Sequence, residues 1–274
     1  MLDRMDGGPL DRARDRDTTE ALTTLVHDWG SSAAHRSALL KSLSGDVEVQ
    51  WRAGRVMPAA SLVKILLVEA ALRRLSPVES SKVSVSLGSL GATRYPTILR
   101  AFDESRKLSL SELCALAIVT SDNPSATYLA DTVGTRAVND LAREANLFHT
   151  RMVGTFADDA IAAEGRYHST TAVEMALLLK RLYINREIDP VCGKIWLWLL
   201  NNLRNTRIPA LLPDSVRVAH KTGTLESIAN DAGVVLADRP YILVLLTDRE
   251  PDPLETSRDM AKLSMAVFEV LGGY

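Results

Sequence analysis

The chain has 274 residues, of which 46% are hydrophobic and 24% are charged, and its formal net charge is −2. A chain of this length can bury a large core, as one large domain or as two smaller units. The nearly balanced charge gives no reason to expect nucleic acid or a membrane surface as a partner. The longest apolar runs, such as 241–246, are too short to span a bilayer.

The N-terminal region predicts a tail, a helix and a hairpin. Residues 1–16 mix Asp and Arg with Gly-Gly-Pro and have no apolar period, so we expect them to be disordered. They also lack the apolar core and cleavage site of a signal peptide, which favours a cytoplasmic protein. A capping-box pattern at Asp17 and Glu20 opens a helix with the apolar stripe Leu22, Leu25, Val26 and Trp29. Residues 37–42 and 46–51 flank a turn at Gly45 and predict a hairpin.

The middle of the chain, from about 76 to 205, predicts mostly helix. Ser109 and Glu112 form a capping box for a helix that ends at Thr120, and Asn123-Pro124 resembles an N-cap followed by proline at the first helical position. Further helices are expected at 135–145, 169–183 and 188–203. The irregular stretch 148–168 lies between helices, and connections of this length are usually functional or mobile.

The C-terminal part predicts strands at 216–222, 231–237 and 240–247, followed by an amphipathic helix at 253–271. The expected fold is α+β, with an antiparallel sheet flanked by helices in three layers and an all-helical insert. We assign 17–60 together with 206–274 to an α/β subdomain and 61–205 to a mostly helical subdomain.

The motif Ser61-Leu62-Val63-Lys64 pairs a nucleophile with an activating group. Strong helix formers follow without Gly or Pro, so Ser61 is expected at a helix N-terminus, with Lys64 on the same face. A desolvated lysine with a lowered pKa can accept the serine proton. By itself the motif is weak, because an N-cap serine near a surface lysine is common.

Two further motifs follow in order, Ser121-Asp122-Asn123 and Lys221-Thr222-Gly223. With all three, the chain resembles the serine β-lactamase and penicillin-binding protein superfamily, in its class A β-lactamase branch. The resemblance runs from about residue 18 to the end and implies an active site between the two subdomains. It is specific for the superfamily and less so for the substrate.

The resemblance implies a role for each motif residue. Ser61 is the nucleophile and Lys64 its activator, although the base for acylation is disputed in this family. Ser121 relays a proton to the leaving group and Asn123 holds a substrate amide, whereas turn chemistry alone would also explain both residues. Asp122 is expected to stabilise the turn without a catalytic role.

The third motif is expected to bind the substrate. The resemblance implies that Lys221 sets the local field and helps to anchor a substrate carboxylate, that Thr222 donates a hydrogen bond nearby, and that Gly223 lets the substrate approach the strand. The oxyanion hole would use the backbone N–H groups of Ser61 and Thr224. Arg207 is a further candidate for carboxylate recognition, with a solvated loop arginine as the alternative.

The pattern departs from class A β-lactamases in the loop after Asn123. Matching Thr150-Arg151 and Thr170-Thr171 to the family's anchor residues places Phe156 at the glutamate that activates the deacylating water. The same match places Ala160 at the asparagine that helps to hold this water. Neither side chain can do this work. The possible substitutes in the loop are Asp158, Asp159 and Glu164, and 226–231 also lacks the arginine that some relatives carry there.

The remaining polar residues predict no cofactor and no metal. His220 is expected to be a buried structural residue that points away from Lys221, and the other histidines show no metal-ligand spacing. Cys114 and Cys192 are expected to be buried, reduced thiols. The only partner we expect is a small-molecule substrate, and we expect a monomer.

We therefore predict a serine acyl hydrolase that acts through a Ser61 acyl-enzyme on an ester, amide or lactam, with slow β-lactam turnover. Three alternatives stay open: a true class A β-lactamase with a substitute deacylation base, a D-alanyl peptidase or transpeptidase, and a non-catalytic sensor that stays acylated. The rate of deacylation separates the sensor from the hydrolases.

Overall fold

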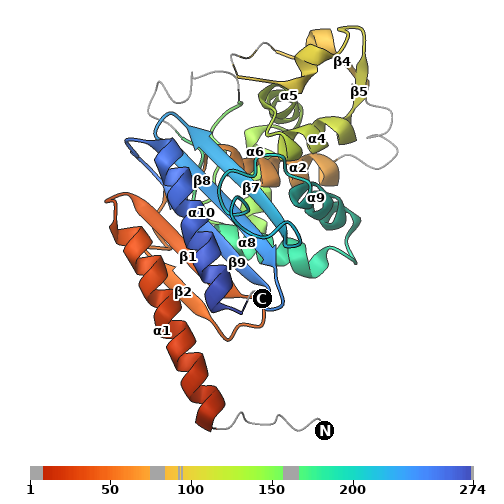
Figure 1. Cartoon of the computed structure of the whole chain (residues 1–274). Helices are drawn as coiled ribbons and strands as arrows, with labels where there is room; N and C mark the ends of the chain where they lie inside the picture. The colour runs from red at the N-terminus through yellow and green to blue at the C-terminus, as the bar shows by residue number, and fades with distance from the viewer. Residues whose placement is uncertain (1–8, 75–83, 92, 94, 157–166, 273–274) are drawn as a thin grey trace.

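The two ends of the chain together form a five-stranded sheet (Figure 1). The computed structural model describes residues 9–74, 84–91, 93, 95–156 and 167–272. The strand order is β2 (Glu48–Trp51), β1 (Arg36–Ser42), β9 (Tyr241–Thr247), β8 (Ile228–Leu236) and β7 (Arg217–Leu225), and every neighbouring pair is antiparallel. The predicted hairpin and the three late strands are confirmed. Strand β8 begins three residues earlier than predicted and forms a tight hairpin with β7.

Helices α1 (Pro9–Ser31) and α10 (Pro253–Val270) cover one face of this sheet (Figure 1). They enclose a buried cluster that includes Leu22, Val26, Leu40, Tyr241, Leu243, Met260 and Phe268. The expectation that residues 9–16 are disordered is wrong, because α1 begins at Pro9. Proline suits a first helical turn, and the arginines, leucine and alanine that follow are good helix formers. Residues 1–8 lie outside the described part of the chain.

Helix α8 (Ala172–Asn185) packs on the opposite face and joins the sheet to the helical unit. That unit contains α2 (Lys64–Arg74), α4 (Leu110–Val119), α5 (Asn123–Val133), α6 (Thr135–Glu144) and α9 (Pro190–Leu200). Helix α2 is central, since all its residues from Lys64 to Ala71 are buried. The capping box predicted for α4 is present, with Ser109 and Glu112 each bonding the backbone of the other. The α+β class with flanking helices is thus confirmed.

Short extended and 3₁₀ segments interrupt the helical unit. Strands β4 (Ser84–Ser86) and β5 (Lys107–Ser109) pair with each other, and β3 (Met57–Pro58) pairs with β6 (Ser169–Thr170). Further 3₁₀ turns lie at η2 (Leu87–Ser89) and η3 (Ile98–Ala101). The insert is therefore mostly rather than entirely helical. Strands of two or three residues are too short to show the alternating pattern that predicts a strand.

The two cysteines lie on neighbouring helices of this unit, Cys114 on α4 and Cys192 on α9. Both are buried and neither is in a disulfide, as predicted. Burial raises the pKa of the Cys114 thiol to about 12, so this side chain is a packing group rather than a nucleophile. Within the described residues, no helix combines the length and apolarity needed to cross a membrane.

Candidate active site

Ser61 lies in a one-turn 3₁₀ helix, η1 (Ala60–Val63), that continues directly into α2 at Lys64. The backbone of Ala60 is in the left-handed region, with φ of 48°. An alanine in this region is strained, and such strain persists only where surrounding contacts hold it. Here the Ala59 N–H donates to the His168 carbonyl oxygen at 2.6 Å, and the Asn230 amide donates to the Pro58 carbonyl oxygen at 2.7 Å. These two hydrogen bonds hold the turn that carries Ser61, which is half-buried.

This turn packs closely against β7, which carries the third motif. A Cβ atom at Gly223 would lie 2.8 Å from the Ala59 carbonyl oxygen and 3.1 Å from the Ala60 Cβ. The 2.8 Å contact with a backbone oxygen would require movement of the backbone, and the 3.1 Å contact is tight. The glycine therefore allows η1 and β7 to approach each other, which is a structural reason for the residue besides the predicted approach of substrate.

The Lys64 side chain is fully buried and donates to groups of the second motif. Its ammonium lies 2.7 Å from the Ser121 carbonyl oxygen, 2.7 Å from Asn123 Oδ1 and 3.5 Å from Ser121 Oγ. Burial lowers the pKa of Lys64 to about 7, against an opposing effect of Asp122. A neutral Lys64 has two N–H groups, which suffice for the two short contacts and leave the lone pair free. The structure shows no hydrogen bond between Lys64 and the Ser61 hydroxyl.

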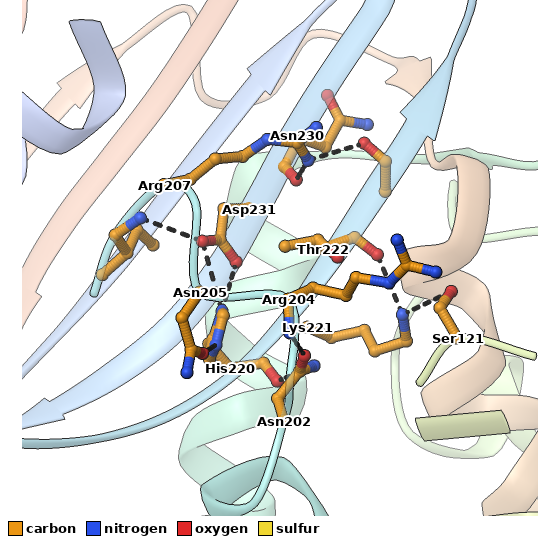
Figure 2. A network of polar contacts seen from close by, with 12 residues as sticks. Ser121, Asn202, Arg204, Asn205, Arg207, His220, Lys221, Thr222, Asn230 and Asp231 are labelled. Atoms are coloured by element: carbon orange, nitrogen blue, oxygen red, sulfur yellow. Dashed lines mark hydrogen bonds and ion pairs between the residues drawn. The ribbon is translucent and has the colours of Figure 1, made fainter. Parts of the chain in front are cut away.

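Ser121 lies between the two motif lysines. Its hydroxyl is 2.8 Å from the Lys221 ammonium, which also donates to the Thr222 carbonyl oxygen at 3.0 Å (Figure 2). The Ser121 backbone is left-handed, with φ of 60°. As at Ala60, a non-glycine residue in this region marks a local strain that the lysine contacts help to hold. Burial, and next the charge of Lys64, lower the pKa of Lys221 well below its usual range.

Asp122 stabilises the turn from behind, as predicted. It caps α5, accepting hydrogen bonds from the Ser125 N–H at 2.9 Å and the Ser125 hydroxyl at 2.6 Å. It also accepts a short hydrogen bond from Thr97. The N-cap is therefore Asp122 and not Asn123 as predicted. Asn123 begins the helix itself, which points its side chain at Lys64.

The chain matches the sequence profile of the β-lactamase enzyme family over residues 17–271. It belongs to the β-lactamase enzyme family. Three solved structures illustrate the shared fold. A β-lactamase from Sphaerobacter thermophilus is 22% identical, with a TM-score of 0.81 over 92% of this chain and 97% of that one. An ancestral class A β-lactamase is 23% identical (TM-score 0.79; 90% and 99% covered), and PBP-A is 20% identical (TM-score 0.77; 93% and 96% covered).

Membership of the β-lactamase enzyme family makes this chain a serine hydrolase, and a covalent acyl-enzyme is typical of the family. The three motifs that carry the resemblance come from η1 and α2, from the turn before α5, and from β7. The fold brings them together around Ser121, which contacts both lysines. The geometry is therefore compatible with a proton path that connects Lys64, Ser121 and Lys221.

Phe156, the residue predicted at the position of the deacylating glutamate, lies against Lys64 and His168. Its ring centroid lies 4.8 Å from the Lys64 ammonium and 4.8 Å from the ring of His168. Burial lowers the pKa of His168 to about 4, and its Nδ1 accepts a hydrogen bond from the Val153 N–H at 3.1 Å. His168 is thus a neutral ring whose Nδ1 lone pair is occupied. Ala160, Asp158, Asp159 and Glu164 lie outside the described residues.

Arg207 is buried and bonded within the protein rather than solvated. Its guanidinium donates to the carbonyl oxygens of Gly223 and Asn230 and to the hydroxyl groups of Thr224 and Ser257. Figure 2 shows Arg207 beside Asn230. These bonds tie β7 to β8 and to α10. The 2.7 Å hydrogen bond to Thr224 Oγ1 joins the buried Arg207 guanidinium to the residue whose backbone N–H is predicted to form part of the oxyanion hole.

His220 is a buried, hydrogen-bonded residue, as predicted. Its ring contacts the Asp231 carboxylate at 2.9 Å and Asn205 Oδ1 at 3.0 Å, on the other side of the strand from Ser121 (Figure 2). The sequence did not single out Asn202, whose amide donates to the His220 carbonyl oxygen at 3.0 Å. This bond fixes the chain after α9 against β7. The described residues contain no group of His, Cys, Asp or Glu side chains that would hold a metal ion.

Proposed function

We propose that the protein is a serine acyl hydrolase that forms an acyl-enzyme on Ser61 and releases β-lactam acyl groups slowly. The substrate would be a small ester, amide or lactam. The observation that carries the proposal is the contact between Phe156 and Lys64. The residues predicted for acylation are all present, but an apolar ring occupies the position where the base for deacylation is expected.

Acylation follows from the two lysines. Lys64, with a pKa of about 7, is a free amine in a substantial fraction of molecules at neutral pH. It accepts the Ser61 proton as the hydroxyl attacks the carbonyl carbon of the substrate. The backbone N–H groups of Ser61 and Thr224 stabilise the oxyanion. The proton passes through Ser121, held at 2.8 Å from Lys221, to the leaving group.

Deacylation lacks this support. The Phe156 ring cannot accept a proton from water, and it covers the Lys64 ammonium. Losing a positioned general base typically slows a step by about 10²–10⁴-fold. A bulky penicilloyl group should therefore remain on Ser61, whereas a small acyl group leaves room for water to approach from another side.

The contact between Phe156 and Lys64 also favours a second function, that of a sensor that becomes acylated on Ser61 and stays acylated. One of the structural neighbours, a point mutant of PBP-A, was obtained as an acyl-enzyme complex with penicillin G. That protein is 20% identical to this chain with a TM-score of 0.78. The likeness therefore supports a shared fold and gives no information on the rate of deacylation in this chain. In a sensor even a small ester would label Ser61 without turnover.

Intact-mass measurement over time tests the proposal. Wild-type protein is incubated separately with penicillin G and with an activated small ester, beside a Ser61→Ala variant. We expect a penicilloyl adduct that persists, a transient adduct with the ester, and no adduct on the variant. Equal labelling of Ser61→Ala would refute the nucleophile, and a persistent ester adduct would favour the sensor.

A further inference from the structure

The two N–H groups predicted to form the oxyanion hole come from distant parts of the chain. The Ser61 N–H belongs to η1, and the Thr224 N–H belongs to β7. Both donors have to point at one oxygen atom, so the spacing between η1 and β7 must be fixed. A misplacement of about 1 Å in such a site can cost about 100-fold in rate.

Asn230 on β8 is in contact with both elements. Its backbone lies opposite Gly223 in the register of β7 and β8, next to the pair formed by Thr224. Its side-chain amide donates to the Pro58 carbonyl oxygen at 2.7 Å, at the start of the turn that leads into η1. One residue therefore connects the turn, through its side chain, to β7, through its backbone.

The Asn230 side chain can reach the turn because Gly223 has no side chain. Residues that lie opposite each other on antiparallel strands project to the same face of the sheet. A Cβ atom at Gly223 would lie 3.4 Å from the Asn230 Cβ and 2.8 Å from the Ala59 carbonyl oxygen. A side chain at position 223 would therefore press on both the turn and Asn230.

Asn230 is itself held in one orientation. The residue is fully buried, and its Oδ1 accepts a hydrogen bond from the Thr247 N–H of β9 at 2.8 Å. Its backbone carbonyl oxygen accepts a hydrogen bond from Arg207. A backbone N–H must meet the amide oxygen and a carbonyl must meet the amide NH₂, so these partners exclude the flipped amide. The position of Pro58 is thus fixed relative to β8 and β9.

The turn requires such an anchor because Ala60 is strained, with φ of 48°. A non-glycine residue keeps this conformation only where its surroundings hold it. The bond from the Ala59 N–H to the His168 carbonyl oxygen holds the turn from one side, and the bond from Asn230 to Pro58 holds it from the side of the sheet. Without the second bond the turn is free to relax, and the Ser61 N–H moves relative to β7.

We infer that Asn230 is a positioning residue that sets the geometry of the oxyanion hole by holding the Pro58 carbonyl oxygen. The inference deepens the proposed function and rests on it. Asn230 acts through η1 and contacts no reacting atom. A role in the stability of the five-stranded sheet alone would not require this bond, because Pro58 lies outside that sheet.

Two variants of Asn230 and one control test the inference. Asn230→Leu keeps the approximate size of the side chain and removes its hydrogen bonds, and Asn230→Ala is the second variant. The control is Thr247→Val, which removes both hydrogen bonds between the Thr247 hydroxyl and the Ala229 backbone and keeps the Thr247 N–H. It weakens the buried contact between β8 and β9 without removing the bond to Pro58. Circular dichroism and the melting temperature show which variants are folded.

The carbonyl group of the acyl-enzyme reports on the oxyanion hole directly. Penicillin G labelled with ¹³C at the lactam carbonyl is reacted with Ser61, and the carbonyl band is recorded by isotope-edited infrared spectroscopy. Hydrogen bonds from the hole polarise the C=O bond and lower its stretching frequency. We expect a low-frequency band in wild type and Thr247→Val and a higher frequency in both Asn230 variants. The acylation rate constant should fall about 10- to 100-fold in the Asn230 variants and stay close to wild type in Thr247→Val.

An unchanged carbonyl band in a folded Asn230 variant would overturn the inference even if the rate falls, because general destabilisation also lowers a rate. An equal shift of the band in Thr247→Val would overturn it as well, since loosening β8 from β9 would then be sufficient. If neither Asn230 variant folds, the residue serves the stability of the sheet and the inference is wrong.

Hydrogen–deuterium exchange of the free protein separates this inference from the proposed function. If wild type forms no adduct with penicillin G or with an activated ester, the proposed function fails. In that case the backbone N–H groups of residues 59–64 should still exchange faster in Asn230→Leu than in Thr247→Val. Equal exchange in the two variants would refute the inference.

Discussion

The Phe156 ring lies 4.8 Å from the Lys64 ammonium nitrogen, in cation–π contact with a lysine that has no exposed surface. Such contacts stabilise a charged lysine by about 0.5–2 kcal/mol, but the ring also excludes water from it. Burial is the larger effect here, since the pKa of Lys64 is lowered and not raised. By excluding water from Lys64, Phe156 contributes to the burial that lowers the pKa of the amine. The same ring occupies the position where a group that activates water is expected.

Replacing either lysine should stop acylation without unfolding the protein. Lys64→Ala removes the proposed base, and Lys221→Ala removes the donor that holds Ser121 Oγ at 2.8 Å. We expect each to lower the acylation rate constant by about 10²–10⁴-fold, measured by stopped-flow with a chromogenic ester. Circular dichroism and the melting temperature show whether the variant is folded. A folded variant that acylates at the wild-type rate would refute the role of that lysine.

The acylation rate should depend on pH through Lys64. The free amine is the reactive form, and with a pKa of about 7 it predominates above pH 7. The rate constant should therefore rise about tenfold per pH unit well below pH 7 and level off above about pH 8. His168, with a pKa of about 4, stays neutral through this range and does not produce the rise.

Phe156→Glu provides a check on this assignment, because a carboxylate beside Lys64 favours the charged ammonium. The rising part of the profile should move to higher pH in this variant. A rate constant that does not change between pH 5.5 and 8.5 would contradict the assignment of Lys64 as the base.

A buried ion cluster at the other end of α2 should matter for stability. The Glu69 carboxylate is fully buried and accepts hydrogen bonds from Arg73 at 2.9 Å and Arg181 at 2.7 Å. Glu69→Ala leaves Arg181 without its carboxylate, whereas Arg73 keeps its ion pair with Asp189 at 2.6 Å. Because removing one partner of a buried ion pair is strongly destabilising, we expect a loss of about 3–5 kcal/mol in the free energy of unfolding. Chemical denaturation measures this change.

The exposed ion pair between Lys41 and Glu48 is the matched control for Glu69. Glu48→Ala should cost less than about 1 kcal/mol, because water screens exposed pairs. Similar losses in the two variants would show that burial does not set the cost at Glu69.

The order of elements was largely predictable because the strong signals are local. The capping box at Ser109 and the three motifs depend on residues close in sequence. The extent of α1 was not predicted, since the charged residues after Pro9 have no apolar period. Their helix formation follows from propensity and from continuity with the packed half of α1.

The contacts that define the site depend on distant parts of the chain, and the sequence alone did not give them. The position of Phe156 was inferred from the family's anchors, but its stacking on Lys64 and His168 requires the fold. The sequence left Arg207 as either a carboxylate-binding residue or a solvated loop arginine. Only the structure shows that it is buried and hydrogen-bonded to the backbone of β7 and β8.

The separation of acylation from deacylation is the central claim, and pre-steady-state kinetics with a chromogenic cephalosporin test it most directly. Wild type should release about one equivalent of product in a burst and then turn over slowly, since Phe156 cannot activate water. A Phe156→Glu/Ala160→Asn double variant should lose the burst and gain steady-state rate by up to about 10²-fold or more. Rapid hydrolysis by wild type without a burst would contradict the account and would indicate that Asp158, Asp159 or Glu164 supplies the base.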